Sequence, residues 1–109
     1  MKTLHRTIAL IIASTALPIF GADAAGNWKE TCAKCHGDDG KGETKMGKKL
    51  SIADLTDPKV QAGFTDEDAF KAMKAGRTDA SGKTTMKAIE GLSDDEMKAL
   101  VPFVRSLKK

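Results

Sequence analysis

The sequence predicts an all-α domain built from three to five short helices. Three segments carry clear helix signals, and two of them begin with a capping pattern. The alternation of apolar and polar residues that indicates strands never extends beyond a few positions. A chain of 109 residues also leaves room for only one such domain.

The helix signal is strongest near the C-terminus. Ser93 and Glu96 have the spacing of a capping box, and the cationic residues from Arg105 onward suit a helix C-terminus. Because Pro102 removes one helical hydrogen bond, we expect a bend between Lys98 and Pro102. The apolar stripe of this helix consists of Met97, Leu100, Val101, Val104 and Leu107.

Other helices are expected upstream. Thr65 and Asp68 resemble a capping pair for a helix over 66–75, which Gly76 would end. The remaining expected elements are a helix around 27–33, a short helix over 57–63 that opens with an Asp-Pro pair, and a loop over 37–49 that is rich in glycine and lysine.

The first 24 residues have the order of a secretory signal peptide. A basic head precedes an apolar run from Ile8 to Phe20, and Ala22-Asp23-Ala24 supplies the small residues that a signal peptidase reads. The apolar run is shorter than the roughly 20 residues that a membrane-spanning helix needs. We expect cleavage of residues 1–24, a domain over residues 25–109 and export to the periplasm; an uncleaved N-terminal anchor is the alternative.

The net charge and the two cysteines bear on which classes of function are possible. With 18 basic and 15 acidic residues, the net charge of +3 is too balanced for a nucleic-acid-binding protein. Export would place the two cysteines, Cys32 and Cys35, in an oxidising compartment, where two thiols ordinarily form a disulfide. His36, which follows Cys35 directly, indicates that these cysteines have another role.

The segment Cys32-Ala33-Lys34-Cys35-His36 has the pattern of covalent haem attachment. Two thiols three positions apart span the two vinyl groups of one porphyrin and form thioethers with them. The histidine is then held beneath the iron as its proximal ligand. The sequence therefore predicts one covalent haem c, which would also enlarge the small core of this domain.

Three other chemistries use two nearby cysteines. A structural disulfide does not require His36. A thiol oxidoreductase belongs in a βαβ setting, which this chain does not predict. A zinc site needs a fourth ligand, and the residues after Ala24 contain no further Cys and no second His.

We expect Met86 to be the sixth ligand of the iron. If the signal peptide is removed, the chain has no second histidine that could bind the iron. One of the four remaining methionines is then the leading candidate for the sixth ligand. Met97 and Met73 lie on apolar helix faces, and Met46 follows His36 too closely to reach the opposite haem face. Met86 lies in a non-helical stretch that can bring its thioether to that face. The other methionines and an open position remain alternatives.

These motifs, in this order, resemble class I c-type cytochromes, in particular the small bacterial kind with a single haem. Lys48 stands where the family has a proline, and the resemblance implies that its carbonyl accepts the proximal imidazole N–H. The matching features are Trp28 four residues before the first cysteine, Gly47 and Leu50 after the histidine, Met86, the segment Gly91-Leu92-Ser93-Asp94 and the last helix.

The resemblance implies a cytochrome c-like fold around one haem and outer-sphere transfer of single electrons. Ligation by His36 and Met86 would favour a high potential. The chain would then be an electron carrier rather than an enzyme, and a monomer without a nucleic-acid partner or a membrane anchor after cleavage. Two alternatives stay open: a haem enzyme or gas-binding sensor with an open or labile sixth position, and a dedicated electron-transfer subunit of a periplasmic oxidoreductase.

Lysines cluster near the expected ligand segments. They form either an ordinary solvated face or a basic rim around the haem edge that steers redox proteins with acidic docking surfaces. The lysines are Lys34, Lys41, Lys45, Lys48 and Lys49 on the proximal side and Lys83 and Lys87 around Met86.

Overall fold

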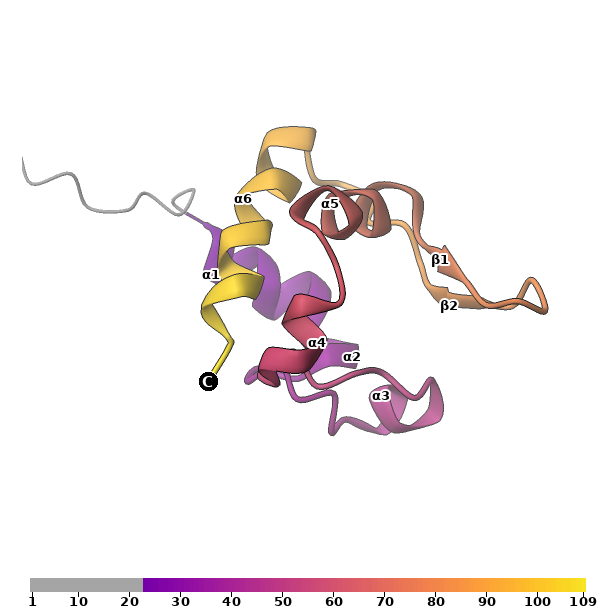
Figure 1. Cartoon of the computed structure of the whole chain (residues 1–109). Coiled ribbons are helices and arrows are strands. Elements are labelled where there is room, and N and C mark those ends of the chain that lie inside the picture. Colours follow the sequence, from indigo (N-terminus) through magenta and orange to yellow (C-terminus); the bar gives the residue numbers. More distant parts are fainter. Residues whose placement is uncertain (1–22) are drawn as a thin grey trace, which may run out of the picture.

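The computed structural model describes residues 23–109, so most of the predicted signal peptide lies outside the described residues. Five helical segments form the body, and one short hairpin projects from it (Figure 1), which confirms the predicted all-α class. The elements are a first helix made of α1 (Ala24–Asn27), a π-helical turn (Trp28–Cys32) and α2 (Ala33–His36), then α3 (Lys45–Lys49), α4 (Pro58–Ala62), α5 (Asp66–Ala75), β1 (Arg77–Thr78), β2 (Thr84–Met86) and α6 (Asp94–Ser106).

Two helices begin as the sequence predicts. At the start of α5, Thr65 and Asp68 form a complete capping box, and Ser93 and Glu96 form another at the start of α6. α6 continues through Pro102 without interruption. The bend expected before this proline stays a prediction.

The first helix is longer than predicted. It begins at Ala24 and continues to His36, and the N–H of Ala33 bonds to the carbonyl of Trp28 across a widened π turn. Ala24 is only 3% exposed. Cleavage after this residue would therefore remove a buried residue of the helix, and the cleavage position stays a prediction.

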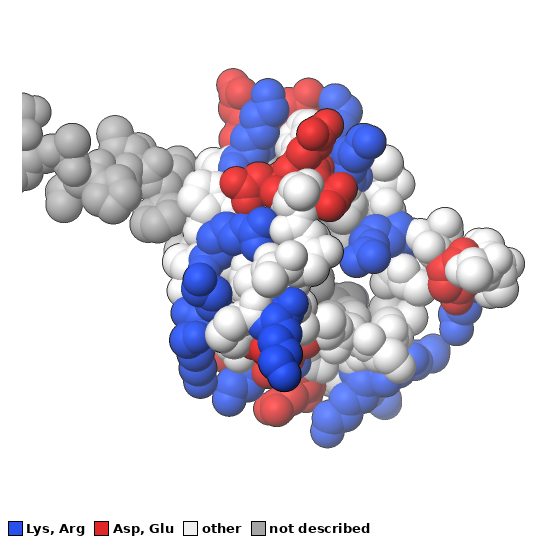
Figure 2. Space-filling view, viewed as in Figure 1, with Lys and Arg blue, Asp and Glu red and all other residues white. Residues whose placement is uncertain are grey.

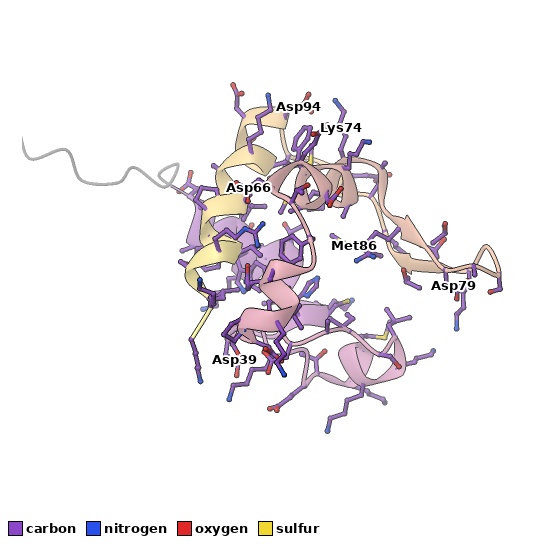
Figure 3. The ribbon with its side chains drawn as sticks, in the orientation of Figure 1. Asp39, Asp66, Lys74, Asp79, Met86 and Asp94 are labelled. Carbon is purple, nitrogen blue, oxygen red and sulfur yellow. The ribbon has the colours of Figure 1, made fainter. Side chains whose placement is uncertain are left out.

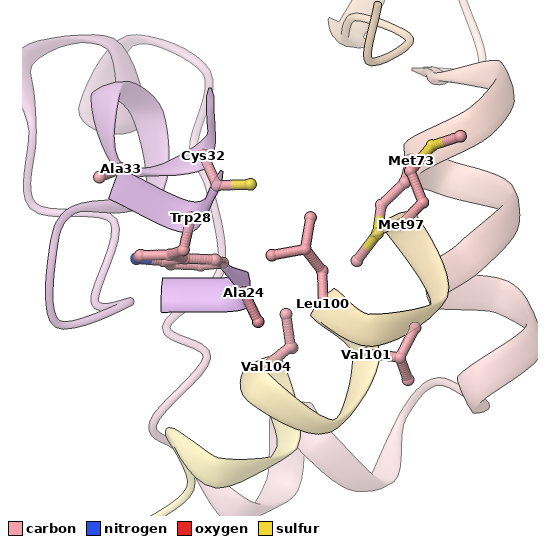
Figure 4. Packing of buried hydrophobic residues seen from close by; sticks show 9 residues of the cluster. All are labelled: Ala24, Trp28, Cys32, Ala33, Met73, Met97, Leu100, Val101 and Val104. Carbon is pink, nitrogen blue, oxygen red and sulfur yellow. The ribbon is translucent and has the colours of Figure 1, made fainter. Parts of the chain in front are cut away.

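The core lies between the first helix and α6. Trp28 and Cys32 lie four positions apart and are both buried, as expected for one face of a helix. Leu100 of α6 is fully buried (0% exposed) and lies between that face and Met73 of α5 (Figure 4). The buried apolar residues are Ala24, Trp28, Cys32, Ala33, Met73, Met97, Leu100, Val101 and Val104.

Two elements differ from the sequence-based expectation. α3 lies inside the predicted loop over 37–49, because the Thr44 side chain accepts the N–H of Gly47 and caps a short helix. The strands of the hairpin span two and three residues, too short to carry a periodic signal. Within residues 23–109 no helix combines the length and the apolar character needed to cross a bilayer.

A buried polar network ties α6 to the chain around α4. Gln61, which is only 4% exposed, donates to the carbonyls of Leu55 and Val104 at 2.6 and 2.9 Å. The Arg105 guanidinium donates to both oxygens of Gln61, to the carbonyl of Phe64 at 2.7 Å and to Asp66 at 2.8 Å. It also lies 4.4 Å from the centroid of the Phe64 ring. One cation thus fixes the backbone on both sides of Phe64.

Replacing this cation should destabilise the fold. We expect Arg105→Ala to lower the free energy of unfolding by about 2 kcal/mol, since it removes several charge-assisted hydrogen bonds and leaves buried carbonyl groups unpaired. Lys108→Ala, an exposed control at the same end of the chain, should stay within about 0.5 kcal/mol of the parent. Denaturant titration measures both values, and equal effects of the two changes would contradict the role assigned to Arg105.

Candidate functional site

Both cysteines of the motif are free thiols. Cys32 ends the π turn and Cys35 lies in α2, one residue before His36 ends the helix. The sulfur of Cys32 points from the first helix toward the side on which Leu100 lies (Figure 4). The disulfide alternative is therefore not realised in this structure, and both sulfurs are available for another bond.

Burial shifts the pKa values of Cys32 and His36. It raises the pKa of the Cys32 thiol to about 11, with a smaller contribution from the neighbouring Cys35, so this thiol is protonated at neutral pH. Burial also lowers the pKa of His36, which favours the neutral imidazole. The neutral form is the one that binds a metal ion.

Two adjoining cavities lie in front of the motif, with volumes of about 480 and 780 Å³. Sites for small molecules and cofactors typically measure about 300–1,000 Å³. The cavities share six lining residues: Cys32, His36, Leu55, Phe64, Arg77 and Met86. A thiol, an imidazole and a thioether therefore border one space, together with the apolar side chains of Leu55 and Phe64 and the cationic Arg77.

Of the four methionines in the described residues, only Met86 lines both cavities together with His36. It lies at the end of β2 near the helical body, whereas Asp79 lies toward the far end of the hairpin (Figure 3). Met73 is buried and lines the smaller cavity, and the exposed Met46 lines the larger one. Met97 belongs to the buried core, in line with its place on the apolar stripe of α6.

The backbone of the motif is held from the proximal side. Thr44 Oγ1 donates to the Cys35 carbonyl at 2.6 Å, and the Gly42 N–H donates to the His36 carbonyl at 2.7 Å. A Cβ atom on Gly47 would lie 2.6 Å from the Cys35 carbonyl oxygen, so no larger residue fits at that position. Sequence reasoning identified Gly47 but missed Thr44, for which the only signal was its place as a possible helix cap.

The His36 ring has an unexpected environment. Its Nδ1 atom is buried and has no hydrogen-bond partner within residues 23–109. The bond expected from the imidazole to the Lys48 carbonyl is not formed, because Lys48 lies inside α3 and its carbonyl accepts the N–H of Ser51 at 3.3 Å. The Nδ1 atom of His36 is thus one of the few buried polar atoms that a folded protein leaves without a partner.

On the distal side, Gly76 lets the Met86 segment approach the end of α5. Its φ is +76°, and a Cβ atom there would lie 2.6 Å from the Met86 carbonyl oxygen and 2.9 Å from the Ala88 nitrogen. The N–H of Ile89 donates to the Met73 carbonyl at 2.8 Å. The position of Met86 is therefore set by close contact between two stretches of backbone.

The family model for cytochrome c matches residues 22–108. The chain belongs to the cytochrome c family. Its structure is similar to that of the KustC0563 c-type cytochrome, with 32% identity, a TM-score of 0.69 and coverage of 80% of this chain and 99% of the other. A tyrosine-to-phenylalanine mutant of Kustc0563 gives 31% identity, a TM-score of 0.66 and coverage of 79% and 99%. A search of the curated proteins gives no match.

Membership settles the cofactor: this cytochrome binds haem c covalently, and its family is one of haem-based electron-transfer proteins. The residues present fit that group, since two free thiols, an imidazole and a methionine border a cavity of suitable size. The two short antiparallel strands are not the βαβ setting of a thiol oxidoreductase. Residues 23–109 contain no group of three or more His, Cys, Asp or Glu side chains that could hold a metal ion.

Filling the space at Gly76 should displace the Met86 segment. We expect Gly76→Ala to lower the free energy of unfolding by about 1–3 kcal/mol more than Gly82→Ala does, because the new methyl group meets backbone atoms that cannot move aside. Gly82 is the matched control: its φ is +83°, but nothing lies within 4 Å of its added Cβ. Denaturant titration of the haem-loaded proteins measures both free energies of unfolding. Equal losses of free energy in the two variants would show that the Met86 backbone is not constrained by Gly76.

Proposed function

We propose that this cytochrome is an exported carrier of single electrons. Cys32 and Cys35 attach its haem, and His36 and Met86 are the axial ligands. The observation that carries this proposal is the shared border of the two cavities, where one imidazole and one thioether occur together with Cys32. Export to the periplasm is supported by the signal-peptide pattern of residues 1–24.

The haem, once attached, supplies the one-electron chemistry. The protein contributes the ligands and the dry, fixed environment around them. His36 provides a neutral imidazole, and Met86 provides a soft thioether that raises the potential relative to a second histidine. Leu55 and Phe64 add apolar surface to the border of both cavities. Because the backbone on both ligand sides is hydrogen-bonded in place, electron transfer requires little movement of this chain.

The distal ligand separates an electron carrier from a haem enzyme or gas-binding sensor. Relative to the parent protein, Met86→Ala should lose the low-spin visible spectrum and show a large drop in reduction potential, because the thioether is removed from the iron. Met46→Ala removes an exposed methionine that lines only the larger cavity, and it should leave both properties unchanged.

Visible spectra in both oxidation states, together with a redox titration of the three proteins, supply the measurement. An unaltered spectrum in Met86→Ala would instead support the open-site alternative. If the loss occurred in Met46→Ala and not in Met86→Ala, Met46 would replace Met86 as the assigned ligand.

We also propose that the partners are redox proteins with acidic docking surfaces. Lys34 and Lys87 border the larger cavity. Figure 2 shows mostly basic side chains along the left and lower margins of one face, whereas most acidic side chains lie at the top, over the start of α6, with basic side chains between them. The first turn of α6 contains Asp94, Asp95 and Glu96. This separation of charge favours a docking orientation that keeps the acidic end of α6 away from an acidic partner.

Steering by lysines makes the transfer rate depend on salt. The second-order rate of electron transfer to a physiological partner should fall as ionic strength rises, since at 0.1 M salt the attraction between exposed charges more than about 10 Å apart is largely screened. Stopped-flow kinetics over a range of salt concentrations provide the test. A flat or rising dependence would contradict the acidic-partner proposal and leave the lysines as a solvated face.

A further inference from the structure

Gln61 of α4 is as deeply buried as the apolar core, with 4% of its surface exposed, although its side chain is polar. It lines neither of the two cavities. Its Nε2 atom donates to the carbonyls of Leu55 at 2.6 Å and Val104 at 2.9 Å, and its Oε1 atom accepts from Arg105 at 3.0 Å. Burying an amide is unfavourable unless its hydrogen bonds are made, and here both polar atoms of the side chain have partners.

The chemistry of these partners accounts for an amide at position 61. Backbone carbonyls only accept hydrogen bonds, whereas a guanidinium group only donates them. An ionised glutamate would lack the donor for the carbonyls, and a lysine would lack the acceptor for the guanidinium. The amide of Gln61 therefore joins the chain before α4 to the C-terminal half of α6 in a way that neither charged residue could.

The backbone positions that this network holds carry side chains that line the cavities. Leu55 and Phe64 line both cavities, and Val104 lines the smaller one. Gln61 binds the carbonyls of Leu55 and Val104 directly. The Arg105 guanidinium, which donates to both oxygens of Gln61, binds the carbonyl of Phe64 at 2.7 Å. One buried amide therefore helps to place the apolar border of the haem space on both sides of α4.

We propose that Gln61 is a positioning residue of the haem site, which holds Leu55, Phe64 and Val104 at the border of the cavities through their backbone. The inference rests on the haem attachment and axial ligation proposed above. The apolar shell around a metal site controls the access of water and thereby the reduction potential. Water stabilises the oxidised iron more than the reduced iron, because the oxidised iron carries one more positive charge. Gln61 should therefore favour the reduced state by keeping this border closed.

The test compares the haem-loaded parent with Gln61→Leu and Val101→Ala by redox titration, by circular dichroism in the Soret band and by denaturant titration. Gln61→Leu removes the hydrogen bonds but keeps a side chain of similar size. Val101→Ala is the matched control, because Val101 is a buried residue of α6 (7% exposed) that lines neither cavity. Its truncation removes buried methyl groups and should lower the unfolding midpoint without touching the haem space.

We expect Gln61→Leu to shift the reduction potential downward and to lose intensity in the Soret circular dichroism, which reports the packing around the haem. Its visible absorption should keep the low-spin spectrum of the parent, because both axial ligands remain. Val101→Ala should keep the potential and the Soret signal of the parent. Parent values in Gln61→Leu, or equal changes in the two variants, would overturn the proposal, because Gln61 would then contribute to stability alone.

If Gln61→Leu gives no haem-loaded protein, Arg105→Lys takes its place in the comparison. Lysine keeps the positive charge but loses the planar fork that reaches Gln61 and the Phe64 carbonyl. A smaller downward shift of the potential is expected, and a potential and Soret signal equal to those of the parent would overturn the proposal. A parent without covalent haem would contradict the proposed function itself, whereas failure of the comparison in a haem-loaded parent contradicts only this inference.

Discussion

The indole of Trp28 connects three parts of the molecule on which the haem site depends. Its ring lies 5.4 Å from the ring of Phe103 on α6 and 5.6 Å from the ring of His36. Its Nε1 donates to the Gly37 carbonyl at 3.1 Å, where the first helix ends. One side chain thus joins the C-terminal helix, the proximal imidazole and the end of the attachment motif.

The distal half is held in a different way. There the end of α5 meets the Met86 segment backbone to backbone at Gly76. The side chains of Gln61 and Arg105 bind backbone carbonyls before and at Phe64. The two halves meet through the apolar cluster around Leu100, and beside this cluster they border the two cavities. A covalent haem is consequently the part that completes the core, in addition to carrying the electron.

The sequence predicted α5 and α6 because each combines a capping box with apolar residues at helical spacing. Thr44 and α3 were missed because a single helical turn shows no periodicity. Met86 could be favoured by elimination among four methionines, whereas its position beside both cavities required the structure. The place of Arg77 depends on the register of a hairpin whose strands are too short to predict, and the unpaired Nδ1 of His36 depends on how α3 turns the Lys48 carbonyl away.

The central claim is that the haem held at Cys32, Cys35 and His36 completes the core of this cytochrome. Urea unfolding of the haem-loaded chain and of a haem-free Cys32→Ala/Cys35→Ala chain, followed by far-ultraviolet circular dichroism, tests this claim most directly. The account predicts a single cooperative transition for the haem-loaded protein and little stable helix, without a cooperative transition, for the haem-free chain. A haem-free chain that kept its helices and unfolded cooperatively at the same midpoint would contradict the account.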